Sequence, residues 1–87
     1  MSFQFISFKE SHAAGEIAIA KEPVSIVSGL RVYKFLSSYD EVVLRDQFGV
    51  KSGPFTHIAL DEKNAYVFDA INNKRLVKMG EYALRDA

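Results

Sequence analysis

Three short runs in the C-terminal half of this 87-residue sequence alternate between apolar and polar side chains. They are FTHIAL from Phe55, AYVFDA from Ala65 and RLVKM from Arg75, and the polar segments DEKN and NN separate them. Alternation with a period of two is typical of strands with one buried face, and short polar segments between strands favour hairpins. The pattern therefore predicts a three-stranded antiparallel meander over residues 55–79.

The two turns set a register for this meander. Asn72 and Asn73 suit a two-residue loop, because asparagine tolerates positive φ, and residues 61–64 suit a four-residue turn. The expected cross-strand pairs are Ile71–Lys74, Phe68–Val77, Tyr66–Met79, Leu60–Ala65 and His57–Phe68. One face then carries Phe55, His57, Ala59, Tyr66, Phe68, Arg75, Val77 and Met79, and the other carries Thr56, Ile58, Leu60, Val67, Asp69, Leu76 and Lys78. A slip of one residue would move all side chains of a strand to the opposite face.

The polar residues of the meander do not converge in this register. His57 and Asp69 point to opposite faces, while Asp61 and Glu62 lie in a turn. Asp69 lies diagonally beside Lys78, in an exposed pair that contributes at most about 1 kcal/mol. The histidine and the acids are therefore expected to belong to a sheet and its turns rather than to one site.

The N-terminal half predicts further strands. Residues 2–8, SFQFISF, have apolar side chains on both faces, which is typical of a strand inside a sheet. Residues 23–36 are rich in β-branched and aromatic side chains around Gly29. This segment predicts either a strand pair or one strand bent at the glycine.

The segment 11–21 is ambiguous. Ser11 suits a helix N-cap, four alanines favour helix, and Pro23 follows the segment as a stop. A strand would instead alternate Ile17 and Ile19 with alanines. The helix is the interpretation that we favour.

A second helix is expected over 38–48. Ser38 and Glu41 have the spacing of a capping box, and Gly49 suits the position after the last turn. Residues 80–87 are expected to form a short tail of one or two helical turns.

Together these segments predict a small α+β fold in a single compact domain over residues 1–87. A mostly antiparallel sheet of four or five strands would carry one or two short helices. An all-β small barrel is the alternative, if residues 16–20 and 41–46 form strands. A chain this short buries about 60–65% of its unfolded surface, so the core is small.

Composition excludes several classes of function. The 11 basic and 11 acidic residues give a net charge of zero, which argues against a nucleic-acid partner, since phosphate binding needs a basic excess. There is no cysteine, so a disulfide framework and a thiolate zinc site are excluded. The sequence has no signal peptide or apolar run long enough to span a membrane, and we expect a soluble, cytoplasmic protein.

Catalytic motifs are weak. His12 and His57 are candidate catalytic residues, because two histidines can act as an acid–base pair in a metal-independent hydrolase or nuclease. Their spacing from the acids matches no metal signature, so no metal site and no cofactor are expected. The segment GVKSGP lacks the spacing of a phosphate-binding loop, and we expect it to be a helix exit and a turn.

The apolar residues point to binding rather than catalysis. Several strands have apolar side chains on both faces, whereas one or two short helices cover only one face of a sheet. The sequence therefore predicts a non-enzymatic binding protein with a protein partner or a second copy of the chain. The candidate binding residues are Arg31, Tyr33, Tyr39, Phe48, Tyr66 and Arg75. A small-ligand-binding protein with its site at a dimer interface is a further alternative.

One segment resembles part of a known group of proteins. AAGEIAIAK, residues 13–21, is similar to a helix of small phage-encoded anti-CRISPR proteins. The resemblance implies an inhibitory or accessory role of the anti-defence type. It covers about a tenth of the chain and transfers no site residue.

Overall fold

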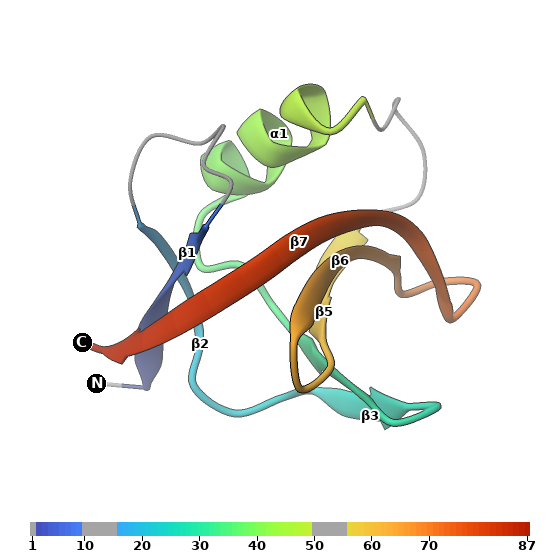
Figure 1. Cartoon of the computed structure of the whole chain (residues 1–87), viewed down its shortest axis with the longest axis horizontal. Helices are drawn as coiled ribbons and strands as arrows, with labels where there is room; N and C mark the ends of the chain where they lie inside the picture. Colours follow the sequence, from blue (N-terminus) through green and yellow to red (C-terminus); the bar gives the residue numbers. More distant parts are fainter. Residues whose placement is uncertain (1, 10–15, 50–55) are drawn as a thin grey trace.

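The computed structural model describes residues 2–9, 16–49 and 56–87, which form one helix and a sheet (Figure 1). The strands are β1 (Phe3–Phe8), β2 (Ile17–Ala20), β3 (Ser25–Val27), β4 (Leu30–Tyr33), β5 (Thr56–Leu60), β6 (Asn64–Asp69) and β7 (Lys74–Asp86), and the helix is α1 (Ser38–Gln47). The described part of the chain is therefore mostly sheet. The α+β prediction is broadly confirmed, although seven strands exceed the four or five that we expected.

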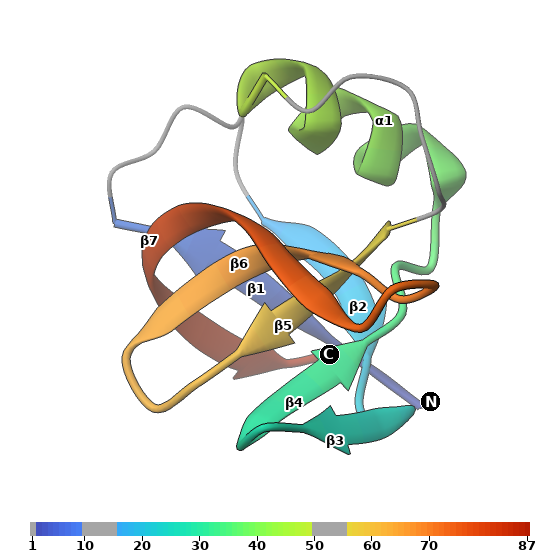
Figure 2. The same cartoon turned by 90° about the vertical axis from the view of Figure 1, so that its right-hand side faces the viewer.

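One antiparallel sheet contains all these strands, in the order β2-β1-β7-β6-β5-β4-β3. The long strand β7 pairs with β6 through its first part and with β1 through its last part. The sheet is strongly curled (Figure 2). A single bridge between Ile19 and Phe35, with a hydrogen bond of 2.9 Å from Ala20 N to Lys34 O, joins β2 to the segment after β4. One bridge is not a ladder, so the barrel of our alternative prediction is not closed.

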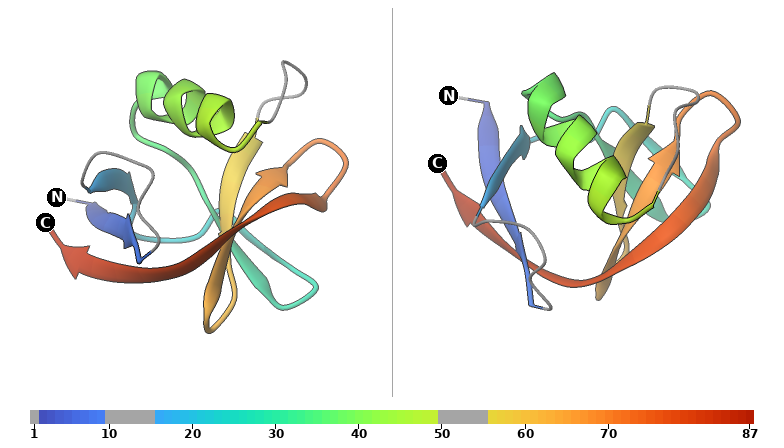
Figure 3. Two further views of the ribbon diagram at one scale, coloured as in Figure 1. Left: turned by 45° about the horizontal axis from the view of Figure 1, so that its top comes forward. Right: turned by 90° about the horizontal axis from the view of Figure 1, so that it is seen from above.

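The main core lies between the curled sheet and α1, which runs across one side of it (Figure 3). The helix contributes Leu44, whose side chain is only 1% exposed. The buried residues of this core are Ile6, Phe8, Ile17, Ile19, Tyr33, Leu44, Ile58, Leu60, Ala65, Val67 and Met79. Phe35, Phe48, Val77 and Tyr82 pack against them.

The opposite face of the β4–β5–β6 region is also buried. Leu30, Val32, Ala59 and Phe68 form a second apolar cluster there, and Phe68 is only 1% exposed. The helix contributes nothing to this cluster. The curl of the sheet therefore buries much of the apolar surface that we expected to require a partner.

Four expected elements are confirmed. Residues 2–8 contain β1, residues 23–36 contain the β3–β4 hairpin, and residues 55–79 contain the meander. The helix expected at 38–48 is α1, with Gly49 at a φ of 71° after its last turn. Its N-cap is Ser37 rather than Ser38, because the Ser37 Oγ accepts the Tyr39 N–H at 3.2 Å.

The helix prediction for 11–21 is wrong where the structure describes the segment. Residues 17–20 form β2, which pairs with β1, and Ile17 and Ile19 are buried while the alanines between them are partly exposed. Residues 10–15 lie outside the described residues. The resemblance of residues 13–21 to a helix therefore fails over β2. Non-local pairing with β1 has overridden the helix propensity of alanine.

The expected helical tail is a strand. β7 continues to Asp86, and residues from Tyr82 onward pair with β1, from Phe8–Tyr82 to Gln4–Asp86. A segment of this length has little helix stability of its own, and the free edge of β1 supplies a ladder of backbone hydrogen bonds.

The predicted register is half right. Between β5 and β6, Leu60 pairs with Ala65 and His57 with Phe68, as expected. Between β6 and β7 all three predicted pairs are wrong. The observed pairs include Asp69–Lys74, Phe68–Arg75, Val67–Val77 and Tyr66–Lys78, with two register shifts. Val77 and Met79 therefore join the main core instead of the face of Phe68.

The side chain of Asp69 explains this difference. Its Oδ1 accepts the N–H of Ile71 at 3.0 Å and of Asn72 at 3.1 Å, which stabilises a four-residue turn over 70–73. Asn73 has the positive φ that we expected, at 53°, but Asn72 does not. Asp69 is 3% exposed and lies opposite Lys74, so its predicted exposed pair with Lys78 is also wrong.

No helix in the described part of the chain has the length and apolar character that crossing a membrane requires.

The β3–β4 turn gives a direct test of this fold. Ser28 and Gly29 both have positive φ, 51° and 82°, the signature of a type I′ hairpin turn. A Cβ added at Gly29 meets nothing within 4 Å, so Gly29→Ala adds backbone strain alone. We expect a loss of about 1–2 kcal/mol in unfolding free energy, measured by urea denaturation.

Ser28→Gly is the matched control. Glycine adopts a φ of 51° without steric cost, so this variant should be as stable as the wild type or slightly more stable. Equal losses in the two variants would contradict the type I′ turn.

Candidate functional site

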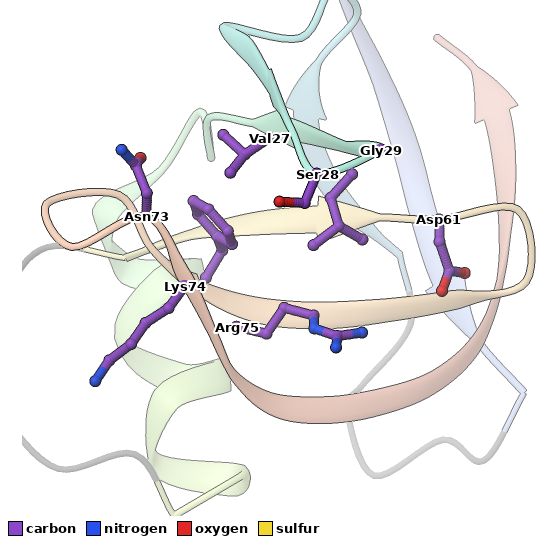
Figure 4. A pocket seen from close by; sticks show the side chains of 9 residues that line it. Val27, Ser28, Gly29, Asp61, Asn73, Lys74 and Arg75 are labelled. Carbon is purple, nitrogen blue, oxygen red and sulfur yellow. The ribbon is translucent and has the colours of Figure 1, made fainter.

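A slit between the β3–β4 hairpin and the start of β7 is the candidate site. Its volume is about 370 Å³. Figure 4 shows that Gly29 and Asp61 lie at one end and Asn73 and Lys74 at the other. The lining residues are Val27, Ser28, Gly29, Leu30, Asp61, Phe68, Asn73, Lys74 and Arg75. The slit therefore runs along the strands. The β3–β4 hairpin forms one wall, and the start of β7 forms the other.

The base of the slit is the second apolar cluster. Leu30 from β4 and Phe68 from β6 lie in both the cluster and the slit lining, and Val27 of β3 packs against them. Successive side chains along a strand point to opposite faces of the sheet. The side chains on one face build the main core, and those on the other face build this second cluster. A ligand in the slit would contact a rigid, buried base.

Asp61 organises the polar end of the slit. Its Oδ1 accepts the N–H groups of Lys63, at 2.8 Å, and Asn64, and its Oδ2 accepts the hydroxyl of Tyr66 at 2.9 Å. The bond from the backbone of Asn64, followed by that from Lys63, lowers the pKa of Asp61 below its ordinary value of 3.8. Asp61 is therefore ionised near neutral pH, and it holds both the β5–β6 turn and Tyr66.

The backbone of Asp61 belongs to the same network. The Tyr82 hydroxyl donates to the Asp61 carbonyl oxygen at 2.7 Å, and Arg31 Nη2 donates to the Tyr82 hydroxyl at 3.1 Å. Burial raises the pKa of Tyr82 above its ordinary value of 10.0. The network thus ties β4 and β7 to the β5–β6 turn at this end.

Arg75 forms part of the slit wall. Its guanidinium carbon lies 5.0 Å from the centre of the Tyr66 ring, in a cation–π contact. In Figure 4 the guanidinium extends along the slit toward the Asp61 end, whereas the Lys74 ammonium points outward at the other end. Both cations have exposed side chains.

Asp69 stabilises the opposite end. Besides its two backbone bonds, its Oδ2 accepts the Asn72 side-chain amide at 2.7 Å. The Asn72 side chain, followed by the Asn72 backbone, lowers the pKa of Asp69 below 3.8. The 70–73 turn that carries Asn73 and Lys74 into the slit wall is therefore held by an ionised carboxylate.

Of the six candidate binding residues, Arg75 alone is in the slit lining, and two others are connected to it by contacts. Tyr66 and Arg75 are in contact, and Arg31 joins them through Tyr82 and Asp61. Tyr33 is 4% exposed in the main core, and Phe48 packs against that core. Tyr39 is 74% exposed on α1, away from the slit lining.

Of the two catalytic candidates, the structure describes only His57. His57 is opposite Phe68 on β5, and burial, followed by the charge of Lys34, lowers its pKa below 6.5. The charge of Glu41 acts in the opposite direction. His12 lies outside the described residues. His57 does not line the slit, and the described residues contain no group of three metal-binding side chains.

Sequence reasoning missed the roles of Asp61 and Tyr82. The spacing of Asp61 and Asn64 is a detectable signal, because aspartate commonly accepts backbone N–H groups two and three residues later. Tyr82 had no such signal, since it lies in the segment that we expected to be a helical tail. Tyr82 and Asp61, whose carbonyl it contacts, are 21 positions apart in the sequence.

No protein-family model, curated protein or solved structure matches this chain.

Asp61→Asn tests the polar end of the slit. The folded-state pKa of Asp61 lies below the unfolded value, so the stability from its charge is present above pH ~4 and is lost as the pH falls through the folded-state pKa. The wild type should therefore be more stable than the variant at pH 7, and the gap should shrink below pH 4. Urea denaturation at a series of pH values measures it. A gap that does not change with pH would contradict the role of the ionised carboxylate.

Proposed function

We propose that this protein is a small non-enzymatic binding protein, and that the slit holds an extended segment of a protein partner. The observation that carries the proposal is the position of the slit between two strand edges. In the described residues β3 pairs only with β4, and residues 74–80 of β7 pair only with β6. An extended segment that lies along the slit is parallel to both walls.

The edge of β3 supports this proposal. The segment from Val24 to Val27 is uncharged, and Val24 and Ile26 are 55% and 69% exposed. Edge strands avoid pairing through charges, proline or short length, and β3 has no charge or proline within its three residues, so its short length is what limits pairing there. Addition of a strand from another chain to such an edge is a common mode of peptide recognition.

The chemistry of the slit supports binding rather than catalysis. Its lining combines apolar side chains, Val27, Leu30 and Phe68, with a larger number of polar and charged ones, which suits a segment that carries both kinds of side chain. Asp61 is its one described carboxylate, and a lowered pKa makes it a poor proton carrier near neutral pH. The inhibitory or accessory role stays a prediction, and it depends on the identity of the partner.

Selection from a library of random octapeptides, fused to a carrier through their C-termini, tests the proposal. We expect an enriched consensus of β-branched and other apolar residues. Synthetic copies of the enriched peptides should bind the wild type and shift the amide resonances of β3 and of residues 73–75 in NMR spectra. Val27→Asp should weaken binding at least about tenfold, because it places a charge against the apolar base.

Val42→Asp is the matched control. Val42 is 50% exposed on α1, outside the slit lining, so the same substitution there should leave binding unchanged. His57→Ala should also leave peptide binding unchanged. In a hydrolase that depends on its histidines, the same substitution would abolish activity. The proposal fails if no consensus emerges, or if the peptides shift resonances away from the slit.

A further inference from the structure

Arg75 forms no ion pair within the described part of the chain. The ion pairs found there involve Lys9, Lys21, Arg45 and Arg85, and none includes Arg75. Asp61 attracts Arg75, but the hydrogen bonds that Asp61 accepts come from two backbone N–H groups and the Tyr66 hydroxyl, and none comes from Arg75. The guanidinium donors of Arg75 therefore remain available to a ligand.

Arg75 is also held in position. Its guanidinium lies over the Tyr66 ring at 5.0 Å, and the Tyr66 hydroxyl is fixed by Asp61 at 2.9 Å. The stacked contact restricts the long side chain before any ligand arrives, which lowers the entropy lost on binding. A planar guanidinium presents paired N–H donors that match a carboxylate.

Arg75 is the cation that an anionic group in the slit would contact, because Lys74 lies opposite Asp69 and points outward. The lining contains two cations, Lys74 and Arg75, against the single carboxylate of Asp61. Leu30 and Phe68 form an apolar base between the two ends. A ligand group that fits this arrangement has an apolar part on the base and a carboxylate at Arg75.

From this arrangement we infer that the slit recognises an acidic side chain, Asp or Glu, on the extended partner segment, with Arg75 as its carboxylate-binding residue. The inference rests on the proposed function and adds the chemical class of the recognised segment. Residues two apart in an extended chain lie on the same face, about 6.5–7 Å apart. The segment therefore places an apolar side chain on Leu30 and Phe68 and the acidic residue two positions away.

A small-molecule titration tests the carboxylate subsite alone. The probes are 3-phenylpropanoate and its uncharged amide, 3-phenylpropanamide, titrated into the full chain and followed by NMR. We expect saturable shifts at Leu30, Phe68 and Arg75 with the carboxylate, and affinity lower by roughly tenfold or more with the amide. Equal affinity for the two probes, or no saturable shift with the carboxylate, would overturn the inference.

Variants identify the residue responsible. Arg75→Gln should reduce carboxylate affinity to that of the amide, whereas Arg75→Lys should keep part of it, since a lysine retains the charge but loses the paired geometry. Arg85→Gln is the matched control, because it removes an arginine from the far end of the same strand. Unchanged affinity in Arg75→Gln would contradict the assignment.

Tyr66→Phe separates the contribution of the Tyr66 hydroxyl from that of the Tyr66 ring. It removes the hydroxyl bonded to Asp61 but keeps the ring beneath Arg75, so we expect an affinity loss several times smaller than that of Arg75→Gln. An affinity loss in Tyr66→Phe as large as that in Arg75→Gln would contradict this division of roles. Thermal melts of each variant show whether the fold is intact.

The octapeptide selection distinguishes failure of this inference from failure of the proposed function. Since the displayed C-termini are fused to a carrier, the carboxylates available in variable positions are those of side chains. Peptides that bind the slit without an acidic residue, with equal affinity for Arg75→Gln, would leave the proposed function intact and overturn the inference. Carboxylate binding with no enriched peptide would overturn the proposed function and leave only Arg75 as a carboxylate-binding residue.

Discussion

The pairing of β7 with two different strands is the interaction on which the structure depends. Its residues up to Glu81 pair with β6, and its residues from Tyr82 onward pair with β1. The ladder shifts register twice along β6, and Gly80 has a φ of 105°, which side-chain-bearing residues rarely adopt. Irregularities of this kind bend a strand and increase its twist. The bend lets one sheet curl around the main core and still leave a second cluster at its outer face.

The slit is a consequence of the same bend. The start of β7 forms one wall, and the last part of the strand supplies Tyr82, whose hydroxyl bonds to the carbonyl of Asp61 at the far end. The β3–β4 hairpin forms the other wall because Ser28 and Gly29 reverse the chain in two residues. Two carboxylates with lowered pKa, Asp61 and Asp69, hold the turns at the two ends. The site is therefore built from rigid turns and ladders.

Local signals explain what could be predicted from the sequence. The β5–β6 register was correct because DEKN is a self-contained turn, with both backbone bonds to Asp61 inside it. The β6–β7 register was wrong because Asp69 closes a four-residue turn that the pair Asn72 and Asn73 does not reveal. β2 and the end of β7 were missed because both depend on β1, a partner far away in the sequence. Alanine content and segment length carry no information about such a partner.

For the candidate site, too, the sequence reveals local features but not the contacts between distant segments. Arg31, Tyr66 and Arg75 were identifiable as polar or aromatic residues on strands. The contact of Tyr66 with Arg75, and the hydrogen bonds that link Arg31 through Tyr82 to Asp61, depend on the strand order and the bend of β7. The sheet face that carries His57 and Phe68 is covered largely by the chain itself, with Phe68 1% exposed. The slit lies at the margin of this face.

Intermolecular nuclear Overhauser effects between an enriched octapeptide and the protein test the central claim most directly. Binding in the slit predicts contacts from the peptide to the ring protons of Phe68 and the methyl groups of Leu30 and Val27. It also predicts contacts from a peptide acidic side chain to Arg75. Contacts to Tyr39 and Val42 on α1 instead, with none to Phe68 or Arg75, would contradict the account.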